Sequence, residues 1–335
     1  MRDAQSTASQ PRIPPGMIKR CPACHGQHFT VLDHIPVAHV VAAYRQAHLA
    51  VDISGLMAGQ GDKIELLACP RCDLRWYWPM VAGDEPFYGQ LQRHDWYYQA
   101  DKPEHRHAAT LVQGGKSVLE VGCGAGAFAA CLPAAATYRG LEFNQAAVAR
   151  ARAKRLDVTQ CSIDVEAASH PGAYDVVCHF QVLEHVPDVA GFMRDCVKAL
   201  RPGGLMVVTV PAEDSFLRLS GAAWLNMPPH HVTRWTDLAL QNLFASLGLQ
   251  APALWHEPVA EYHVDWYRSV LAEQGLRQFL GGRAGLAGGG LAARLAYRAA
   301  PWKRLQGWLV ARGESGFGFK GRGHSVTAVG RLLPH

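Results

Sequence analysis

Short apolar runs alternate with amphipathic stretches along the middle of the chain, from residue 111 to residue 256. The apolar runs are bounded by turn residues and rich in Val, Leu and Ile, so they predict buried strands. The stretches between them have helical spacing, and Asn144 and Gly248 stand where a cap and a stop are expected. This alternation predicts an α/β fold, with a parallel sheet covered by helices on both faces. The expected strands are residues 118–121, 138–141, 158–161, 174–179, 205–210, 249–255 and 325–331, and the expected helices are residues 125–131, 145–155, 191–200 and 236–247.

The pattern breaks at both ends of this core. Residues 1–17 carry Ser, Thr, Gln and Pro without periodicity, which predicts a disordered leader. Residues 81–110 are rich in aromatic side chains and follow a module, residues 18–80, that contains four cysteines. We expect residues 81–110 either to pack between this module and the core or to form a lid. Residues 257–323 predict a helical insertion, either a cap over a substrate pocket or a basic surface for lipid. The predicted divisions are residues 1–17, 18–80, 81–110, 111–256, 257–323 and 324–335.

A glycine-rich turn follows the first expected strand of the core. Residues 118–128 read VLEVGCGAGAF, so Gly122, Gly124 and Gly126 leave room for a ligand to approach backbone N–H groups. Glu120 precedes the glycines, and Glu142 ends the second expected strand about 20 residues later, where an acid can accept hydrogen bonds from ribose hydroxyls. The spacing differs from that of dinucleotide-binding folds, which favours a nucleoside ligand without a pyrophosphate.

These features resemble the class I S-adenosylmethionine-dependent methyltransferases, which carry the motif ExGxGxG and an acid after the second strand. Residues 174–188 and 200–204 are similar to later landmarks of that family. The resemblance implies a Rossmann-like seven-stranded sheet that binds S-adenosyl-L-methionine. It also implies that Asp164 lies near the adenine and that Tyr98 lies on a helix covering the cofactor. The cofactor contacts implied are Glu120, Gly122, Cys123, Gly124, Gly126, Glu142, Phe143, Asp164, Gln181 and Tyr98.

Two CxxC pairs precede the core, at Cys21 and Cys24 and at Cys69 and Cys72. Each pair can form a tight turn that presents two thiolates, and two such turns suit one tetrahedral zinc ion. The long loop between the pairs also leaves room for a nearby histidine, His25, His28 or His34, to replace one cysteine. A closed four-thiolate site has no open position, so we expect structural zinc that contributes folding energy to a small module. The other five cysteines are expected to be buried thiols.

Four histidines are candidates for a general base near the ends of the fourth and fifth strands. His179 and His185 belong to the fourth strand and its loop, and His230 and His231 lie in the segment PPHHVTRW. That segment is similar to a Glu-His pair in zinc-ribbon sugar C-methyltransferases, which implies that His231 is the base. His230 stands where that family has glutamate, and Met227 where it has tyrosine. A purely structural role for His231, in orienting the loop, remains open.

Composition bounds the protein further. The net charge of +5 comes with only 18% charged residues, so no basic stripe for DNA is expected. No uninterrupted apolar run suggests a membrane span, and no export signal opens the chain, so we expect a cytoplasmic protein. The odd number of cysteines argues against a disulfide framework.

Three functions are compatible with these patterns. The first is methylation of a small-molecule acceptor that resembles a sugar, polyketide or quinone, including a nucleotide-linked one. The second is RNA methylation, although the module lacks interleaved basic and aromatic residues. The third is a non-catalytic scaffold that retains the fold. The oligomeric state is open.

Overall fold

The structure is a computed structural model, and it describes residues 19–46, 51–91, 93, 102–220, 224–279, 303–315 and 317–334. The predicted leader, the aromatic triplet that contains Tyr98, and most of the Gly- and Ala-rich part of the insertion lie outside these residues. Among the helices described, none combines the length and apolar character needed to cross a membrane.

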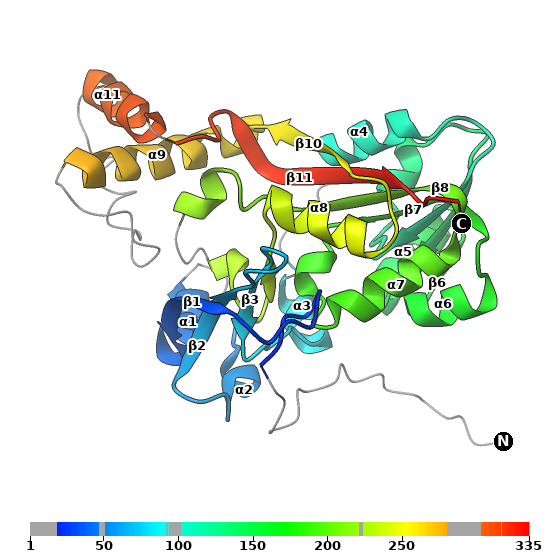
Figure 1. The fold of residues 1–335 in the computed structure, drawn as a ribbon, viewed down its shortest axis with the longest axis horizontal. Coiled ribbons are helices and arrows are strands. Elements are labelled where there is room, and N and C mark those ends of the chain that lie inside the picture. Colours follow the sequence, from blue (N-terminus) through cyan, green and yellow to red (C-terminus); the bar gives the residue numbers. More distant parts are fainter. Residues whose placement is uncertain are drawn as a thin grey trace.

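The core is a seven-stranded mixed sheet in the order β10-β11-β8-β7-β4-β5-β6 (Figure 1). β4, β5, β6, β7 and β8 are parallel, whereas β11 runs antiparallel between β8 and β10. The central strands are buried on both faces, which explains their continuous apolar runs. The prediction of a seven-stranded α/β sheet is confirmed. The strands are β4 (Ser117–Val121), β5 (Thr137–Leu141), β6 (Val158–Thr159), β7 (Tyr174–Phe180), β8 (Leu200–Pro211), β10 (Ala253–Pro258) and β11 (Arg322–Arg331).

Helices and short 3₁₀ turns connect these strands. As predicted, Asn144 caps the helix after β5, and its side chain accepts a hydrogen bond from Ala147 N at 2.8 Å. The expected helix at residues 125–131 is only a 3₁₀ turn, because Gly124 and Gly126 adopt positive φ and keep the chain out of a helix. The connecting elements are α4 (Pro103–Leu111), η1 (Phe128–Cys131), α5 (Gln145–Ala153), α6 (Ile163–Ser169), η2 (Leu183–His185), α7 (Val189–Ala199), η3 (Phe216–Leu219), η4 (Trp224–Asn226) and α8 (Asp237–Ser246).

The N-terminal module has a sheet of its own, in the order β1-β2-β3-β9. Its last strand, β9 (Thr233–Arg234), comes from the segment after β8, and it pairs antiparallel with β3. The module and the main sheet also share one continuous hydrophobic core, which contains Trp76 of the module together with Trp235 and Val208. The module is therefore built into the core. Its elements are β1 (Thr30–Pro36), α1 (Val37–Gln46), α2 (Ser54–Met57), β2 (Lys63–Ala68), β3 (Arg75–Trp78) and α3 (Glu85–Leu91).

A buried ion cluster reinforces this junction. Glu213 binds Arg75 of β3 at 2.5 Å and Arg234 of β9 at 2.6 Å. Replacing Glu213 by glutamine should lower the free energy of unfolding by about 3–5 kcal/mol, because Arg234 would remain buried without its counter-charge. Chemical denaturation measures this change, with the exposed Glu261→Gln as control. A loss below about 1 kcal/mol would show that the two arginines find other partners.

The insertion before the last strand contains η5 (Glu261–His263), α9 (Val264–Phe279) and α11 (Lys303–Glu314). In Figure 1 the two helices project from the end of the sheet at which β11 begins. They cross closely at two glycines: a Cβ on Gly313 would lie 1.9 Å from Leu271 O, and one on Gly275 would lie 2.1 Å from Leu309 O. The Gly-rich composition of this segment thus has a packing reason within the described part of the insertion.

Candidate functional site

The glycine-rich turn lies at the carboxyl end of β4. Gly122, Gly124 and Gly126 have φ values of 72°, 55° and 73°, and residues other than glycine rarely adopt these values. Space is also lacking, because a Cβ on Gly122 would lie 2.6 Å from Val182 Cγ2. The turn is therefore shaped by glycine both in its backbone conformation and in its contacts.

Glu142 ties this turn to the next strand. Its carboxylate accepts hydrogen bonds from Gly124 N and Asn144 N, each at 2.8 Å. An ionised carboxylate has about four lone-pair positions, so two backbone donors leave capacity for the hydroxyl groups of a ligand. Glu142 thus holds the turn and keeps the capacity to accept further hydrogen bonds.

Glu120 lies beneath the turn and is only 3% exposed. Tyr138 donates its hydroxyl hydrogen to Glu120 at 2.6 Å. Burial raises the pKa of Glu120 to about 8, so this carboxyl holds a proton at neutral pH in the protein described. A cation bound nearby would favour its ionised form.

The remaining predicted cofactor contacts follow the same edge of the sheet. Phe143 is 63% exposed directly after β5, and Asp164 is exposed in the first turn of α6. Gln181 follows β7 with a left-handed φ of 55°, and its amide donates to Ser325 Oγ at 2.8 Å. Cys123 is buried against Gly140, where a Cβ would lie 2.6 Å from its sulfur. The structure brings all of these to one edge; Tyr98 lies outside the described residues.

Three histidines gather beside this edge, and we refer to His185, His230 and His231 as the histidine cluster. One ring nitrogen from each lies within 4.8 Å of those of the other two, so the cluster could hold a proton or a metal ion. His230 and His231 are stacked with ring centroids 4.4 Å apart, and His185 meets both edge-on. Their convergence joins the loop after β7 to the segment before β9, as the sequence predicted for His230 and His231.

The partner of each Nδ1 decides where the protons of the cluster lie. His185 Nδ1 lies 2.5 Å from His230 O, His230 Nδ1 lies 2.9 Å from Leu225 O, and His231 Nδ1 lies 3.1 Å from Asn226 Oδ1. Carbonyl oxygens only accept hydrogen bonds, so each Nδ1 must carry the hydrogen. Burial lowers the pKa of His185 to about 4 and that of His230 to about 3, and it lowers the pKa of His231 well below its ordinary value. At neutral pH the three rings are uncharged, with a basic lone pair on Nε2.

Glu184 stands next to the cluster and was not singled out from the sequence. Its side chain is 1% exposed, and one of its oxygens lies 3.7 Å from His185 Nε2 and 3.9 Å from His231 Nε2. Neither oxygen has a hydrogen-bond partner among the described residues. Burial raises the pKa of this carboxyl to about 8, so it holds a proton at neutral pH. A neutral acid therefore faces two neutral bases.

His179, by contrast, does not join the cluster. It is fully buried in β7, and its ring packs edge-on against Phe192 of α7 at 5.3 Å. Burial lowers its pKa to about 3. It is part of the core and cannot serve as a base for a ligand at the sheet edge.

The N-terminal module supports the segment that carries His230 and His231. Tyr77 donates to Asn226 O at 2.8 Å and Tyr44 to Met227 O at 3.2 Å, while Tyr88 lies 3.2 Å from His185 Nδ1. Gly83 N donates to the carbonyl of Pro229 at 2.8 Å. The aromatic richness of the module was the only sequence signal for these contacts, and it did not indicate their targets.

The four cysteines of the module converge as predicted. Cys21 and Cys72 have sulfurs 3.5 Å apart, and so have Cys24 and Cys69. Four thiolates around one tetrahedral ion at about 2.3 Å have sulfurs about 3.8 Å apart, so the arrangement fits zinc. The two turns are alike, since the residue after each pair has positive φ and donates its N–H to the first cysteine of its pair at 2.9 Å. No histidine belongs to this cluster in the described part of the chain.

Comparisons with known proteins agree with this geometry. Residues 92–253 match the family model described as a methyltransferase domain. The chain is 34% identical over 174 residues to a probable S-adenosylmethionine-dependent methyltransferase of Mycolicibacterium smegmatis, covering 51% of this chain and 65% of that protein. It is 40% identical over 97 residues to a ubiquinone biosynthesis O-methyltransferase of Sodalis glossinidius, covering 27% of this chain and 39% of that protein. The chain thus spans between 39% and 65% of the length of these two curated relatives.

Two solved structures align with about three quarters of the chain. A methyltransferase from Archaeoglobus fulgidus that depends on S-adenosylmethionine aligns with 73% of this chain and 99% of its own, at 14% identity and a TM-score of 0.49. A possible histamine N-methyltransferase from Thermotoga maritima aligns with 73% of this chain and 96% of its own, at 13% identity and a TM-score of 0.47.

Proposed function

We propose that residues 92–253 form a class I S-adenosylmethionine-dependent methyltransferase domain and that the protein methylates a small-molecule acceptor with His231 as the general base. One observation carries the proposal: the histidine cluster presents uncharged imidazoles, held by Nδ1, at the same sheet edge as the glycine-rich turn and Glu142. Ligands of open α/β sheets bind at this edge.

The cofactor residues fit S-adenosyl-L-methionine. This molecule supplies an activated methyl group with a neutral thioether as leaving group, so the protein needs chiefly to align the acceptor. Glu142 would hold the ribose hydroxyls, the turn at Gly122 and Gly124 would pack against the amino-acid part, and Phe143 and Asp164 would flank the adenine. Glu120 would support the turn from below through its bond to Tyr138.

The proton of the acceptor is the task left to the histidines. His231 is oriented by Asn226, and its Nε2 lone pair can take a proton from an acceptor hydroxyl or an acidic C–H group. An oxygen of Glu184 lies 3.9 Å from this nitrogen, so it can accept a hydrogen bond from the imidazolium that forms when the acceptor's proton moves to His231.

The acceptor is best sought among hydroxylated small molecules. A ubiquinone biosynthesis O-methyltransferase is among the relatives, which favours a phenol-like hydroxyl, while the PPHHVTRW segment favours a sugar, including a nucleotide-linked one. In the N-terminal module, the hydroxyls of Tyr44 and Tyr77 donate hydrogen bonds to the loop that carries His230 and His231. That use supports a small acceptor over RNA, because these rings cannot stack on bases.

We also propose that Cys21, Cys24, Cys69 and Cys72 bind one structural zinc ion. All four thiolates would be spent on the ion, so the site leaves no position for substrate. The other five cysteines are free thiols, which suits a reducing compartment and supports a cytoplasmic location.

Calorimetry with S-adenosylmethionine tests the proposal. We expect binding by the folded wild-type protein, and about 10²-fold weaker binding by Glu142→Ala, because hydrogen bonds to a charged group contribute about 1.5–3 kcal/mol each. The control is Asp157→Asn. Asp157 directly precedes β6, and its side chain is 60% exposed and pairs with Arg139. Folding of both variants is checked by circular dichroism. Absence of cofactor binding by folded wild-type protein would overturn the methyltransferase proposal and favour a scaffold.

A further inference from the structure

A second group of metal-ligating side chains lies outside the residues used above. Glu257 is the last residue but one of β10, His263 ends η5, and His324 lies near the start of β11. One ligand atom from each lies within 4.8 Å of those of the other two. The rings of His263 and His324 are nearly perpendicular, at 82°, with centroids 4.6 Å apart. Three segments far apart in the sequence therefore bring one carboxylate and two imidazoles together.

Glu257 is the buried member of this group, with a side chain that is 0% exposed. Its Oε1 accepts hydrogen bonds from His324 N at 3.0 Å and Ser325 N at 3.2 Å, and it contacts His324 Nδ1. Its Oε2 has no hydrogen-bond partner among the described residues. A carboxylate oxygen buried in this way needs a cation or a donor, because the lost hydration is otherwise uncompensated.

His263 carries a second buried polar atom that lacks a hydrogen-bond partner among the described residues. Its Nδ1 has no hydrogen-bond partner in the described part of the chain, and its ring is enclosed by Trp266, His324 and Tyr262. An ion pair between Glu257 and His324 accounts for one oxygen and one imidazole. It does not account for Glu257 Oε2 or for His263 Nδ1. One cation between the three side chains would satisfy both.

We propose that Glu257, His263 and His324 bind a divalent transition-metal ion, with zinc as the first candidate. Two imidazoles and one carboxylate suit zinc, iron or manganese better than calcium or magnesium, which prefer oxygen ligands throughout. Three protein ligands also leave an open position on a tetrahedral ion, unlike the closed set of four cysteines. In the resting protein this position would hold water.

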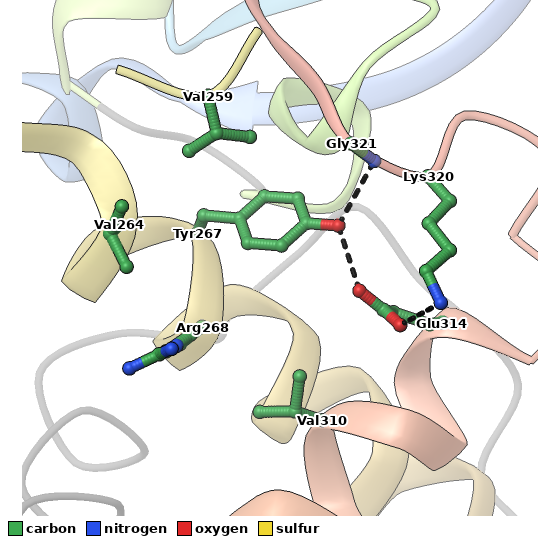
Figure 2. Close-up of a pocket in the computed structure, with 8 residues that line it drawn as sticks. All are labelled: Val259, Val264, Tyr267, Arg268, Val310, Glu314, Lys320 and Gly321. Atoms are coloured by element: carbon green, nitrogen blue, oxygen red, sulfur yellow. Dashed lines mark hydrogen bonds and ion pairs between the residues drawn. The ribbon is translucent and has the colours of Figure 1, made fainter. Parts of the chain in front are cut away.

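The surroundings indicate what the open position would face. β11 begins opposite the end of β8, where Ser325 pairs with Pro211, and thus at the sheet edge that carries the candidate active site. A pocket of about 410 Å³ is lined by Val259, Val264, Tyr267, Val310 and Lys320 among others (Figure 2), and Val264 directly follows His263 in the chain. The chain segments that carry the three ligands therefore also border this pocket and the sheet edge. An oxygen ligand such as a carboxylate or hydroxyl, with an apolar body, fits this combination.

Metal analysis of the full chain tests the proposal independently of methyl transfer. Purified protein is incubated with excess zinc, desalted, and measured by elemental analysis and zinc X-ray absorption. We expect two zinc ions per chain and a mixed ligand shell, with sulfur at about 2.3 Å and nitrogen or oxygen at about 2.0–2.1 Å. His263→Ala and His324→Ala should each reduce the content to one zinc ion with a sulfur shell only.

Two controls separate this site from its neighbours. The first is His256→Ala. His256 precedes Glu257 in the chain but pairs with Asp237, so this variant should still bind two zinc ions. His231→Ala tests the histidine cluster. A nitrogen shell that survives His263→Ala but disappears in His231→Ala would overturn the proposal, as would a single zinc ion with pure sulfur ligands in the wild type. Glu257→Gln keeps the side-chain volume, so it serves if an alanine variant does not fold, and it should likewise reduce the content to one.

Discussion

Replacing Cys69 and Cys72 by serine is expected to unfold the N-terminal module and to abolish activity. Structural zinc contributes about 10–16 kcal/mol to folding in zinc-finger peptides, which exceeds or matches the stability of a typical domain. Loss of the zinc site would also release β3 from β9 and withdraw Tyr77 from Asn226, so the loop with His230 and His231 would lose its support. The double variant should contain no sulfur-bound zinc and should melt at a lower temperature.

Thermal melting followed by tryptophan fluorescence reports on this change, since Trp76 is buried at the junction. The matched control is Cys131→Ser, a half-buried thiol outside the cluster. The glycine-rich turn and Glu142 belong to the main sheet, so binding of S-adenosylmethionine should persist at least in part. A double variant that keeps the wild-type melting temperature would show that the module folds without metal.

His231→Ala is expected to lower kcat by about 10²–10⁴-fold, the usual contribution of a general base. Affinity for S-adenosylmethionine should stay near the wild-type value, because Glu142 and the glycine-rich turn are unchanged. The assay follows methyl transfer to hydroxylated acceptors, beginning with phenols and nucleotide-linked sugars. The control is His39→Ala, which changes an exposed histidine of α1.

The pH dependence distinguishes a base from a residue that only holds the loop. Burial lowers the pKa of His231, so the imidazole stays uncharged as the pH falls below the ordinary value of about 6.5. Activity that depends on this base should therefore be retained at pH 6.5 and lost only at lower pH, as the ring takes up a proton. If His231 is structural, the variant should bind the acceptor more weakly while its kcat keeps the wild-type dependence on acidic pH.

Several parts of the candidate site were predictable because their signals are local. The turn at Gly122, Gly124 and Gly126 follows from residues that tolerate positive φ, and the cap at Asn144 follows from a side chain three residues from its donor. The CxxC turns are local as well, and their pairing is the arrangement that a tetrahedral ion requires. His230 and His231 were placed near the site because they follow the fifth strand of the core.

Other parts depend on contacts that no local pattern encodes. β9 is two residues long, and it exists because Thr233 and Arg234 meet β3 across more than 150 residues of chain. Among the described residues Glu184 has no hydrogen-bond donor for its side chain, which is likewise a property of what surrounds it. The strand predicted at residues 249–255 lies later in the chain for a similar reason. Pairing with β11 defines β10, which therefore starts at Ala253.

The sequence by itself thus determined the α/β sheet, the glycine-rich turn, the pairs of cysteines and the histidines near the site. Periodicity, backbone conformation and ligand spacing act over a few residues, and they are written into neighbouring positions. Only the tertiary structure decided which proton each imidazole carries, how the module holds the loop of the histidine cluster, and that Glu257, His263 and His324 meet. Burial and hydrogen-bond partners set these properties, and both depend on segments that come together only in the folded chain.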